Sequence, residues 1–307
     1  EPKLENAKTL KKYPTYIVAG MGGSNLVTGL LKIWKPNLNI ITHRGYGLPN
    51  LPAKTLKQSL LIASSYSGNT EETIDAYQKA LRAKIPAVVV ASGGKLLDLA
   101  KKYEKPYIQL PHDGVQPRVA LGYSILSFLK ILNDFTLLRE AKDLSQGLKS
   151  TEYERGGKVL ARKFKGIVPI IYASERNSAL AYIWKIVLNE SAKIPAFFNL
   201  FPELNHNEMT GFDVKENTRD LSQKMMFIFL KDAQDHPRIL KRMNVTERLY
   251  RERGLPVEVI IVNGKSPLHK LFSSVLIAQW TAFYLAKEYG IDPEQVPLVE
   301  EFKKLIK

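Results

Sequence analysis

The chain has 307 residues, a formal net charge of +15 and no cysteine. This length can bury a substantial core and equals about two average domains, and the lack of cysteine excludes disulfides, thiolate zinc sites and cysteine nucleophiles. The positive charge would attract any polyanion, but the basic residues are scattered through amphipathic segments with no helix-turn-helix or zinc-finger pattern, so we expect no nucleic-acid binding.

Other function classes are excluded by short-range patterns. No run approaches the roughly 20 apolar residues of a membrane span, and residues 1–12 are charged and polar, unlike a signal peptide. We therefore expect a cytoplasmic protein with no membrane association. The five histidines lack metal-ligand spacing, and no GxSxG turn of a serine hydrolase is present, so we expect neither a metal nor a serine nucleophile.

The first half of the chain alternates short apolar runs with amphipathic segments. The apolar runs, which predict strands, cover residues 16–19, 38–42, 60–63, 87–91 and 106–109. Strands separated by helices predict βαβ units and a doubly wound parallel sheet covered on both faces. A long helical region is predicted at 121–148. Together these elements predict a first α/β domain over residues 1–148.

The first predicted strand runs directly into the turn Gly20-Met21-Gly22-Gly23-Ser24-Asn25. Glycines in such a turn let the backbone approach a ligand closely. A dinucleotide fingerprint is disfavoured, because Asn25 replaces its third glycine and the second strand ends in His43 and Arg44 rather than in an acid for a ribose. A Walker loop is excluded because the Gly-Lys-Ser/Thr ending is missing. The turn therefore predicts a small phosphorylated ligand.

The third predicted strand ends in a hydroxyl-rich turn that contains Ser65, Ser67 and Thr70 and leads into a helix near Glu71. Such a turn gathers side-chain hydroxyls, backbone N–H groups and the positive end of a helix dipole, which suits a phosphate dianion. The same residue types also form an ordinary helix N-cap or capping box. This turn by itself leaves both interpretations open.

The second half repeats the pattern of strand, serine-containing turn and helix. Its predicted strands are 167–172, 194–198, 225–230 and 257–262, after a basic helix at 157–165. This weak internal resemblance predicts a second α/β domain over residues 149–307, with a linker near 143–152. Two helices, at 266–288 and 299–306, close the chain on either side of a glycine and a proline.

Two residues of the second half are candidates for proton transfer. Glu190 ends an apolar helix, where the negative end of the helix dipole and apolar neighbours raise a carboxyl pKa and favour a general base. The alternative is a solvated acid beside Lys193. His206 lies between Glu203 and Glu208 and could shuttle a proton near neutral pH if a carboxylate orients it. The alternative is a loop histidine with local hydrogen bonds only.

Six motifs bring these observations together: GMGGSN at 20–25, SYSGNTEET at 65–73, QPRVALG at 116–122, NESAK at 189–193, PELNHNE at 202–208 and VEEFKK at 299–304. In this order they resemble the bifunctional phosphoglucose/phosphomannose isomerase family of the sugar isomerase (SIS) superfamily, over nearly the whole chain. The resemblance implies two SIS domains and a homodimer. It also implies an enzyme that needs no cofactor and interconverts glucose 6-phosphate and fructose 6-phosphate through a cis-enediol.

The resemblance also assigns roles to residues by motif. The hexose 6-phosphate would be held through its phosphate by Gly22, Gly23, Ser24, Ser65, Ser67 and Thr70. Arg118 matches the arginine that stabilises the enediolate, and Glu190 matches the base that moves the proton between C2 and C1. His206 matches the residue that opens the sugar ring and would come from the partner subunit. Lys303, next to Lys304, matches the lysine near the ring oxygen.

Some features differ from the family or leave more than one function open. Val296 stands where the family has Thr or Gln, which leaves acceptance of mannose 6-phosphate open, and family members have a longer N-terminal helix. The isomerase half of a glucosamine 6-phosphate-forming amidotransferase is disfavoured, because that chemistry needs a cysteine nucleophile. A non-catalytic SIS-type sugar-phosphate sensor would need the phosphate site without the proton-transfer set. The joint presence of Glu190, His206, Arg118 and Lys303 favours an enzyme.

Overall fold

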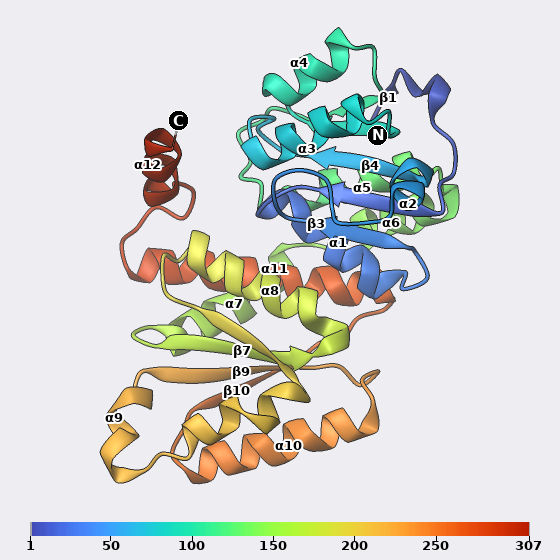
Figure 1. The fold of residues 1–307 in the computed structure, drawn as a ribbon. Coiled ribbons are helices and arrows are strands. Elements are labelled where there is room, and N and C mark those ends of the chain that lie inside the picture. Colours follow the sequence, from blue (N-terminus) through green and yellow to red (C-terminus); the bar gives the residue numbers. More distant parts are fainter. Residues whose placement is uncertain (1, 307) are drawn as a thin grey trace. The chain divides into compact units, whose positions relative to one another are not determined.

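The computed structural model describes residues 2–306, shown as a ribbon in Figure 1. The chain divides into two compact units that meet between Ser145 and Gln146, three residues before the predicted boundary. The division falls in the last turn of helix α6 (Phe135–Gly147). Each unit is an α/β structure around its own sheet. No helix of residues 2–306 combines the length and the apolar composition required to cross a membrane.

The first unit contains a six-stranded sheet in the order β1-β6-β5-β4-β2-β3. The strands are β1 (Leu4–Glu5), β2 (Thr15–Ala19), β3 (Ile40–His43), β4 (Ser59–Ser64), β5 (Ala87–Ala91) and β6 (Tyr107–Gln109). All neighbours pair in parallel except β1, which lies antiparallel to β6 at one edge. The predicted parallel sheet is confirmed. The two-residue β1 was missed because it is too short to produce a periodic pattern.

Side-chain alternation along the strands explains the two helix layers of this unit. Ile17 of β2 and Leu61 of β4 belong to one buried cluster with Tyr77 of α3 (Glu71–Arg82) and Leu97 of α4 (Gly94–Lys102). The intervening residues, such as Val18, face the opposite side of the sheet and are fully buried. On that side α1 (Gly23–Trp34) packs against α5 (Leu121–Leu132) (Figure 1). The short α2 (Ala53–Gln58) precedes β4.

The long helical region predicted at 121–148 is helical, but it is divided into two helices. The structure has two helices, α5 and α6, separated at Asn133, which adopts a left-handed conformation with φ of 54°. Asparagine tolerates this conformation and commonly ends a helix. The next residue, Asp134, accepts a hydrogen bond from the backbone N–H of Leu137 at 3.1 Å and so caps the start of α6.

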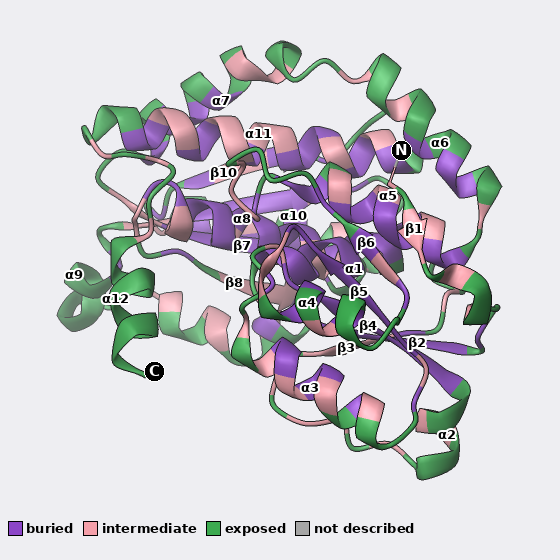
Figure 2. Cartoon of the chain, turned by 90° about the horizontal axis from the view of Figure 1, so that it is seen from above, coloured by how far each residue is buried: buried purple, intermediate pink, exposed green. Residues whose placement is uncertain are grey.

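The second unit contains a four-stranded parallel sheet in the order β10-β9-β7-β8. The strands are β7 (Val168–Ser174), β8 (Phe197–Phe201), β9 (Met225–Lys231) and β10 (Val257–Ile261). In Figure 1, α8 (Ser178–Glu190) and α11 (Pro267–Glu288) cover one face and α10 (Pro237–Glu252) covers the other. An aromatic cluster that includes Tyr172, Phe227 and Tyr250 fills the α10 side. The central strands β2, β4, β5 and β7 are almost wholly buried, whereas β3, β8 and β10 are only partly buried (Figure 2).

The remaining helices of this unit flank the sheet. Helix α7 (Thr151–Phe164) packs along α11, and α9 (Arg219–Ser222) is a single turn before β9. Helix α12 (Pro297–Leu305) closes the described chain with no buried residue, and its side chains Leu298 and Phe302 are exposed. The strand predicted at 194–198 begins three residues later, at Phe197. Residues 191–196 instead form the turn after α8, where the Asn189 amide donates to the carbonyl of Ile194 at 2.9 Å.

Candidate active site residues

In the first unit the two predicted phosphate loops follow β2 and β4, which are neighbours in the sheet. The chain proceeds from β2 to β3 on one side and then to β4 on the other, so the strand order reverses at this point. Ligands of open parallel sheets bind in the crevice at the carboxyl ends of the strands where the order reverses. The topology therefore places both loops at the expected ligand position of this sheet.

The serine-rich loop is folded around its own hydroxyl groups. The hydroxyls of Ser65 and Thr70 are 2.8 Å apart, and the Gly68 N–H donates to Ser65 Oγ at 3.1 Å. Thr70 is the N-cap residue of α3 but makes no side-chain capping hydrogen bond. The ordinary N-cap interpretation is therefore wrong for Thr70, because its hydroxyl contacts the loop. The backbone N–H groups in the first turn of α3 are left to other hydrogen-bond acceptors. Ser67 is exposed beside it.

The glycine loop is joined to the serine-rich loop by Ser24. The Tyr66 N–H donates to Ser24 Oγ at 2.9 Å, and the Ser64 hydroxyl donates to the Ser24 carbonyl at 3.2 Å. Gly22 is the N-cap of α1 and has φ of 49°, which favours glycine. The amino ends of α1 and α3 thus meet at one edge of the sheet, and their combined partial positive charge favours an anion there.

A third segment, which precedes α5, brings Arg118 to the same place. A Cβ atom on Gly23 would lie 2.6 Å from the carbonyl carbon of Pro117 and 2.7 Å from the backbone nitrogen of Arg118, so the two loops are in close contact. Arg118 is only 2% exposed. The segment is fixed by Asp113, which accepts from Tyr66 OH at 3.0 Å and from Tyr123 OH at 2.7 Å.

The hydrogen bonds of Asp113 change the acidity of the groups around it. The bond from Tyr123 holds the pKa of the Asp113 carboxyl below its usual value. Burial and the bond to Asp113 raise the pKa of Tyr66 to about 12. Asp113 therefore stays ionised and both phenols stay protonated at neutral pH, which keeps this connection intact.

The glycine loop, the serine-rich loop and the segment of Arg118 form a cradle, and the sequence analysis missed one part of it. The turn after β5, Ser92-Gly93-Gly94, packs on the serine-rich loop: Ser92 Oγ donates to the Tyr66 carbonyl at 2.7 Å, and a Cβ atom on Gly68 would lie 1.7 Å from the Gly93 carbonyl oxygen. The signal was present, because this is a third strand that runs into a serine and glycines before a helix.

In the second unit the corresponding edge of the sheet carries two aspartates and a lysine. Ser174, at the end of β7, donates to Asp235 at 2.7 Å, and Lys270 Nζ lies 2.7 Å from Asp232. The Asn177 amide donates to both acids, at 3.3 and 3.1 Å. Burial and the nearby Asp232 charge raise the pKa of Asp235, although the Ser174 hydrogen bond opposes the shift. The serine turn of this unit is therefore occupied by the protein's own carboxylates.

Glu190 is the last residue of α8, as predicted, and is partly buried. The chain after it is fixed by Lys193, whose ammonium donates to the carbonyls of Ser191 and Asp292. Asp292 lies in the connection that leads to Val296, the N-cap of α12. The turn after α8 and the connection that precedes α12 are thus in contact at Lys193.

His206 is exposed and ends the short 3-10 helix Glu203–His206 after β8. In the described part of the chain, Glu203 accepts from the Asn207 amide at 2.7 Å, while Glu208 accepts from Tyr172 OH and from the Asn199 amide. The expectation that a flanking carboxylate orients the His206 ring is therefore wrong within one chain. The two acids hold the loop that presents His206 to solvent.

The structure does not bring Glu190 and His206 together within one chain. Helix α8 returns from the carboxyl end of β7, so Glu190 lies at the amino edge of the sheet, whereas His206 follows the carboxyl end of β8. The five residues of β8 alone separate these edges by about 17 Å. Lys303 is exposed on α12 and pairs with Glu300 at 2.7 Å. In residues 2–306, no cluster of three or more histidine or acidic side chains could hold a metal ion.

Comparison with known proteins agrees with these observations. A family model described as the bacterial phospho-glucose isomerase C-terminal SIS domain matches residues 154–306. A bifunctional phosphoglucose/phosphomannose isomerase from Caldicellulosiruptor bescii is 34% identical, over 94% of this chain and 88% of that protein. One from Aquifex aeolicus is 31% identical, over 98% of this chain and 93% of that protein. The chain belongs to the bifunctional phosphoglucose/phosphomannose isomerase family.

The fold of this family member also has distant structural relatives. A hypothetical protein from Thermus thermophilus superposes with a TM-score of 0.71 at 17% identity, over 96% of this chain and 83% of that one. At this identity the likeness concerns the fold alone. The predicted family membership and the α/β fold with parallel sheets are both confirmed.

The close contact at Gly23 gives a prediction for this isomerase family member. Gly23→Ala is expected to lower the free energy of unfolding by about 2 kcal/mol, because the added methyl group meets backbone atoms of Pro117 and Arg118 that cannot rotate away. Displacement of Arg118 should also lower turnover. Gly122→Ala is the control, since its Cβ meets nothing within 4 Å in helix α5 and should stabilise by about 0.5 to 1 kcal/mol. Urea unfolding would show equal stability for both variants if the Gly23 contact were unimportant.

Proposed function

We propose that the protein interconverts glucose 6-phosphate and fructose 6-phosphate through a cis-enediol, with mannose 6-phosphate as a further substrate to be tested. The observation that carries this proposal is the cradle of the first unit. Hydroxyl groups, backbone N–H groups and two helix amino ends meet there at the carboxyl edge of the sheet. This arrangement suits a terminal phosphate dianion. Membership of the isomerase family supplies the reaction class.

In this proposal the first unit anchors the substrate. Ser24, Ser65, Ser67 and Thr70, with the backbone of Gly22 and Gly23, bind the phosphate. The binding energy of this non-reacting group then positions the open-chain sugar for reaction. Arg118, which is 2% exposed, stabilises the enediolate oxygen, where negative charge develops. A fixed cation at such a position stabilises the transition state more than the ground state.

The second unit supplies proton transfer in this proposal. His206 exchanges a proton with the ring oxygen and the anomeric hydroxyl to open the sugar, assisted by Lys303. Glu190 then takes the proton from C2 of the aldose, which gives the cis-enediolate. The proton of the C2 hydroxyl passes to O1, and Glu190 returns its proton to C1 to form the ketose. The reverse reaction starts from C1. Every proton removed is returned, so the sequence needs no oxidant and no cofactor.

We further propose a homodimer in which His206 reaches the substrate from the partner subunit. The support is the separation of Glu190 and His206 at opposite edges of one sheet, about 17 Å apart along β8. The exposure of His206, without a carboxylate partner among residues 2–306, also fits a residue that acts elsewhere. A dimer makes both residues available to one substrate molecule.

The first unit is proposed to be an SIS domain like the second. The family model covers residues 154–306 only, so the assignment of the first unit relies on its parallel sheet and on the phosphate cradle at its strand-order reversal. We also propose a cytoplasmic location, where a chain without cysteine would not depend on an oxidising compartment.

A turnover assay in deuterated water tests the proposed function. With fructose 6-phosphate as substrate, we expect glucose 6-phosphate to accumulate with deuterium at C2, because the proton held by Glu190 exchanges with solvent during the enediol stage. Measuring mannose 6-phosphate in the same samples tests whether Val296 permits the second epimer. A sensor would bind fructose 6-phosphate and form neither aldose, and that result would overturn the proposal.

A further inference from the structure

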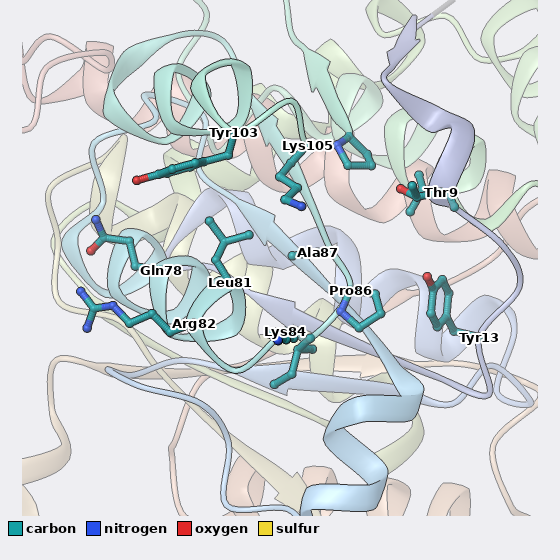
Figure 3. A pocket seen from close by; sticks show the side chains of 13 residues that line it. Thr9, Tyr13, Gln78, Leu81, Arg82, Lys84, Pro86, Ala87, Tyr103 and Lys105 are labelled. Carbon is teal, nitrogen blue, oxygen red and sulfur yellow. The ribbon is translucent and has the colours of Figure 1, made fainter.

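A second concave site lies in the first unit, away from the phosphate cradle. The cavity has a volume of about 680 Å³ and opens at the amino ends of β5 and β6, next to Pro86 and Pro106 (Figure 3). The cradle follows the carboxyl ends of the parallel strands. The five residues of β5 therefore separate the two sites by about 17 Å. A cavity of this volume is in the range of small-molecule sites.

The lining of this cavity combines an apolar floor, two aromatic rings and three cations. Leu81, Pro86 and Ala87 form the floor, and Figure 3 shows Tyr13 and Tyr103 on opposite sides of it. Tyr13 is buried, while Tyr103 is 49% exposed and presents ring surface to a ligand. Flat apolar groups stack on such rings. The floor and the exposed Tyr103 ring therefore suit a ligand with a planar body.

The three cations are Arg82, Lys84 and Lys105, and the lining contributed by residues 2–306 contains no acidic residue. None of the three forms a salt bridge within 4.0 Å to any residue from 2 to 306. Arg82 has a weak electrostatic effect on Asp75, but the pKa of that carboxyl is lowered mainly by its hydrogen bond from Lys79. The cations at this cavity are thus not neutralised by the protein's own acids.

Helix ends offer only a partial explanation for these cations. The carboxyl ends of α3 and α4 face this edge, and each carries about half a negative charge. Together they offset about one of the three positive charges. A net positive charge of about two remains beside exposed aromatic surface. An anion binds these cations most strongly when no acidic side chain competes for them. The remaining positive charge therefore favours a phosphorylated ligand.

We propose that this cavity binds a nucleoside phosphate, with the base on the Tyr103 ring and the phosphates on Arg82, Lys84 and Lys105. This site is separate from the sugar-phosphate cradle and does not depend on the function proposed for it. Helix α3 begins at the cradle with Glu71 and ends in the cavity wall with Arg82, so the two sites share one rigid element.

The proposal is tested by calorimetric titration of the full chain with ADP. A variant that combines Arg82→Gln, Lys84→Asn and Lys105→Gln is expected to bind ADP at least about tenfold more weakly, because each lost cation removes a charge-assisted contact. Asparagine is chosen for Lys84 because its φ of 54° is left-handed and asparagine tolerates this conformation. Lys57→Gln, on the exposed face of α2, is the matched control and should leave ADP affinity unchanged.

Two further measurements test where ADP binds and which parts of it are recognised. Ser67→Asp places a negative charge in the cradle and should leave ADP binding in the cavity intact. Adenosine alone and inorganic phosphate alone should each bind more weakly than ADP. Thermal unfolding checks that each variant is folded. Equal ADP affinity in the triple variant and the parent, loss of ADP binding in Ser67→Asp, or no binding of ADP by the parent at millimolar concentration would each overturn the proposal.

Discussion

Glu190→Gln is expected to lower kcat for fructose 6-phosphate isomerisation by about a thousandfold. The amide keeps the size of the side chain but cannot accept the proton from carbon, and positioned acid–base groups contribute about 10² to 10⁴ in rate. KM should change little, because in the proposed mechanism the cradle of the first unit binds the phosphate and Glu190 does not. Steady-state kinetics with a coupled assay for glucose 6-phosphate measures both quantities.

The control for this variant is Glu175→Gln. Glu175 is an exposed acid after β7 and should be replaced without loss of activity. Incorporation of deuterium from solvent at C2 should fall with kcat in Glu190→Gln, since both depend on the same proton. A Glu190→Gln enzyme with parental turnover would mean that another group is the base, and the motif-based assignment would then be wrong.

Lys270→Met is expected to reduce the free energy of unfolding by about 3 to 5 kcal/mol at neutral pH, because removing one partner of a buried ion pair leaves the other as an uncompensated buried charge. Lys270 and Asp232 are 8% and 1% exposed at their side chains, and their charged atoms lie 2.7 Å apart. The isolated charge costs far more than the intact pair gains. Urea unfolding monitored by tryptophan fluorescence measures the loss.

Two companion variants identify the cause of this loss. Lys165→Met removes an exposed pair with Glu288 at 3.1 Å and should cost less than about 1 kcal/mol. Combining Lys270→Met with Asp232→Asn should recover much of the loss, since no buried charge is left. A loss below about 1 kcal/mol in Lys270→Met alone would show that water or another group compensates Asp232.

The pH dependence of the same pair has a definite sign. Burial by itself raises the pKa of Asp232, but the hydrogen bonds from Lys270, Gln234 and Asn177 outweigh it and hold the pKa below its usual value. A lowered pKa in the folded state gives stability that is present above the unfolded pKa of about 3.9 and is lost as pH falls through the folded value. The difference between the parent and Lys270→Met should therefore shrink below about pH 4.

The sequence determined the elements and the chemistry that depend on neighbouring residues. Apolar runs located all five of the parallel strands in the first unit, because a buried parallel strand is apolar on both faces. The glycine turn at Gly22 and the hydroxyls of Ser65 and Thr70 predicted a phosphate cradle, because turn geometry and helix ends are set by local residue type. The break at Asn133 was also readable, since an asparagine followed by Asp134 ends one helix and caps the next.

Only the tertiary structure decided which of these residues meet. Sheet order placed the turns after β2 and β4 side by side and put Gly23 against the backbone of Arg118, contacts between segments far apart in the chain. The same topology separated Glu190 from His206 and joined Lys270 to Asp232. Local residue patterns carry no information on strand order or on which buried charges become partners. Those outcomes depend on how whole layers pack, which is a property of the assembled chain.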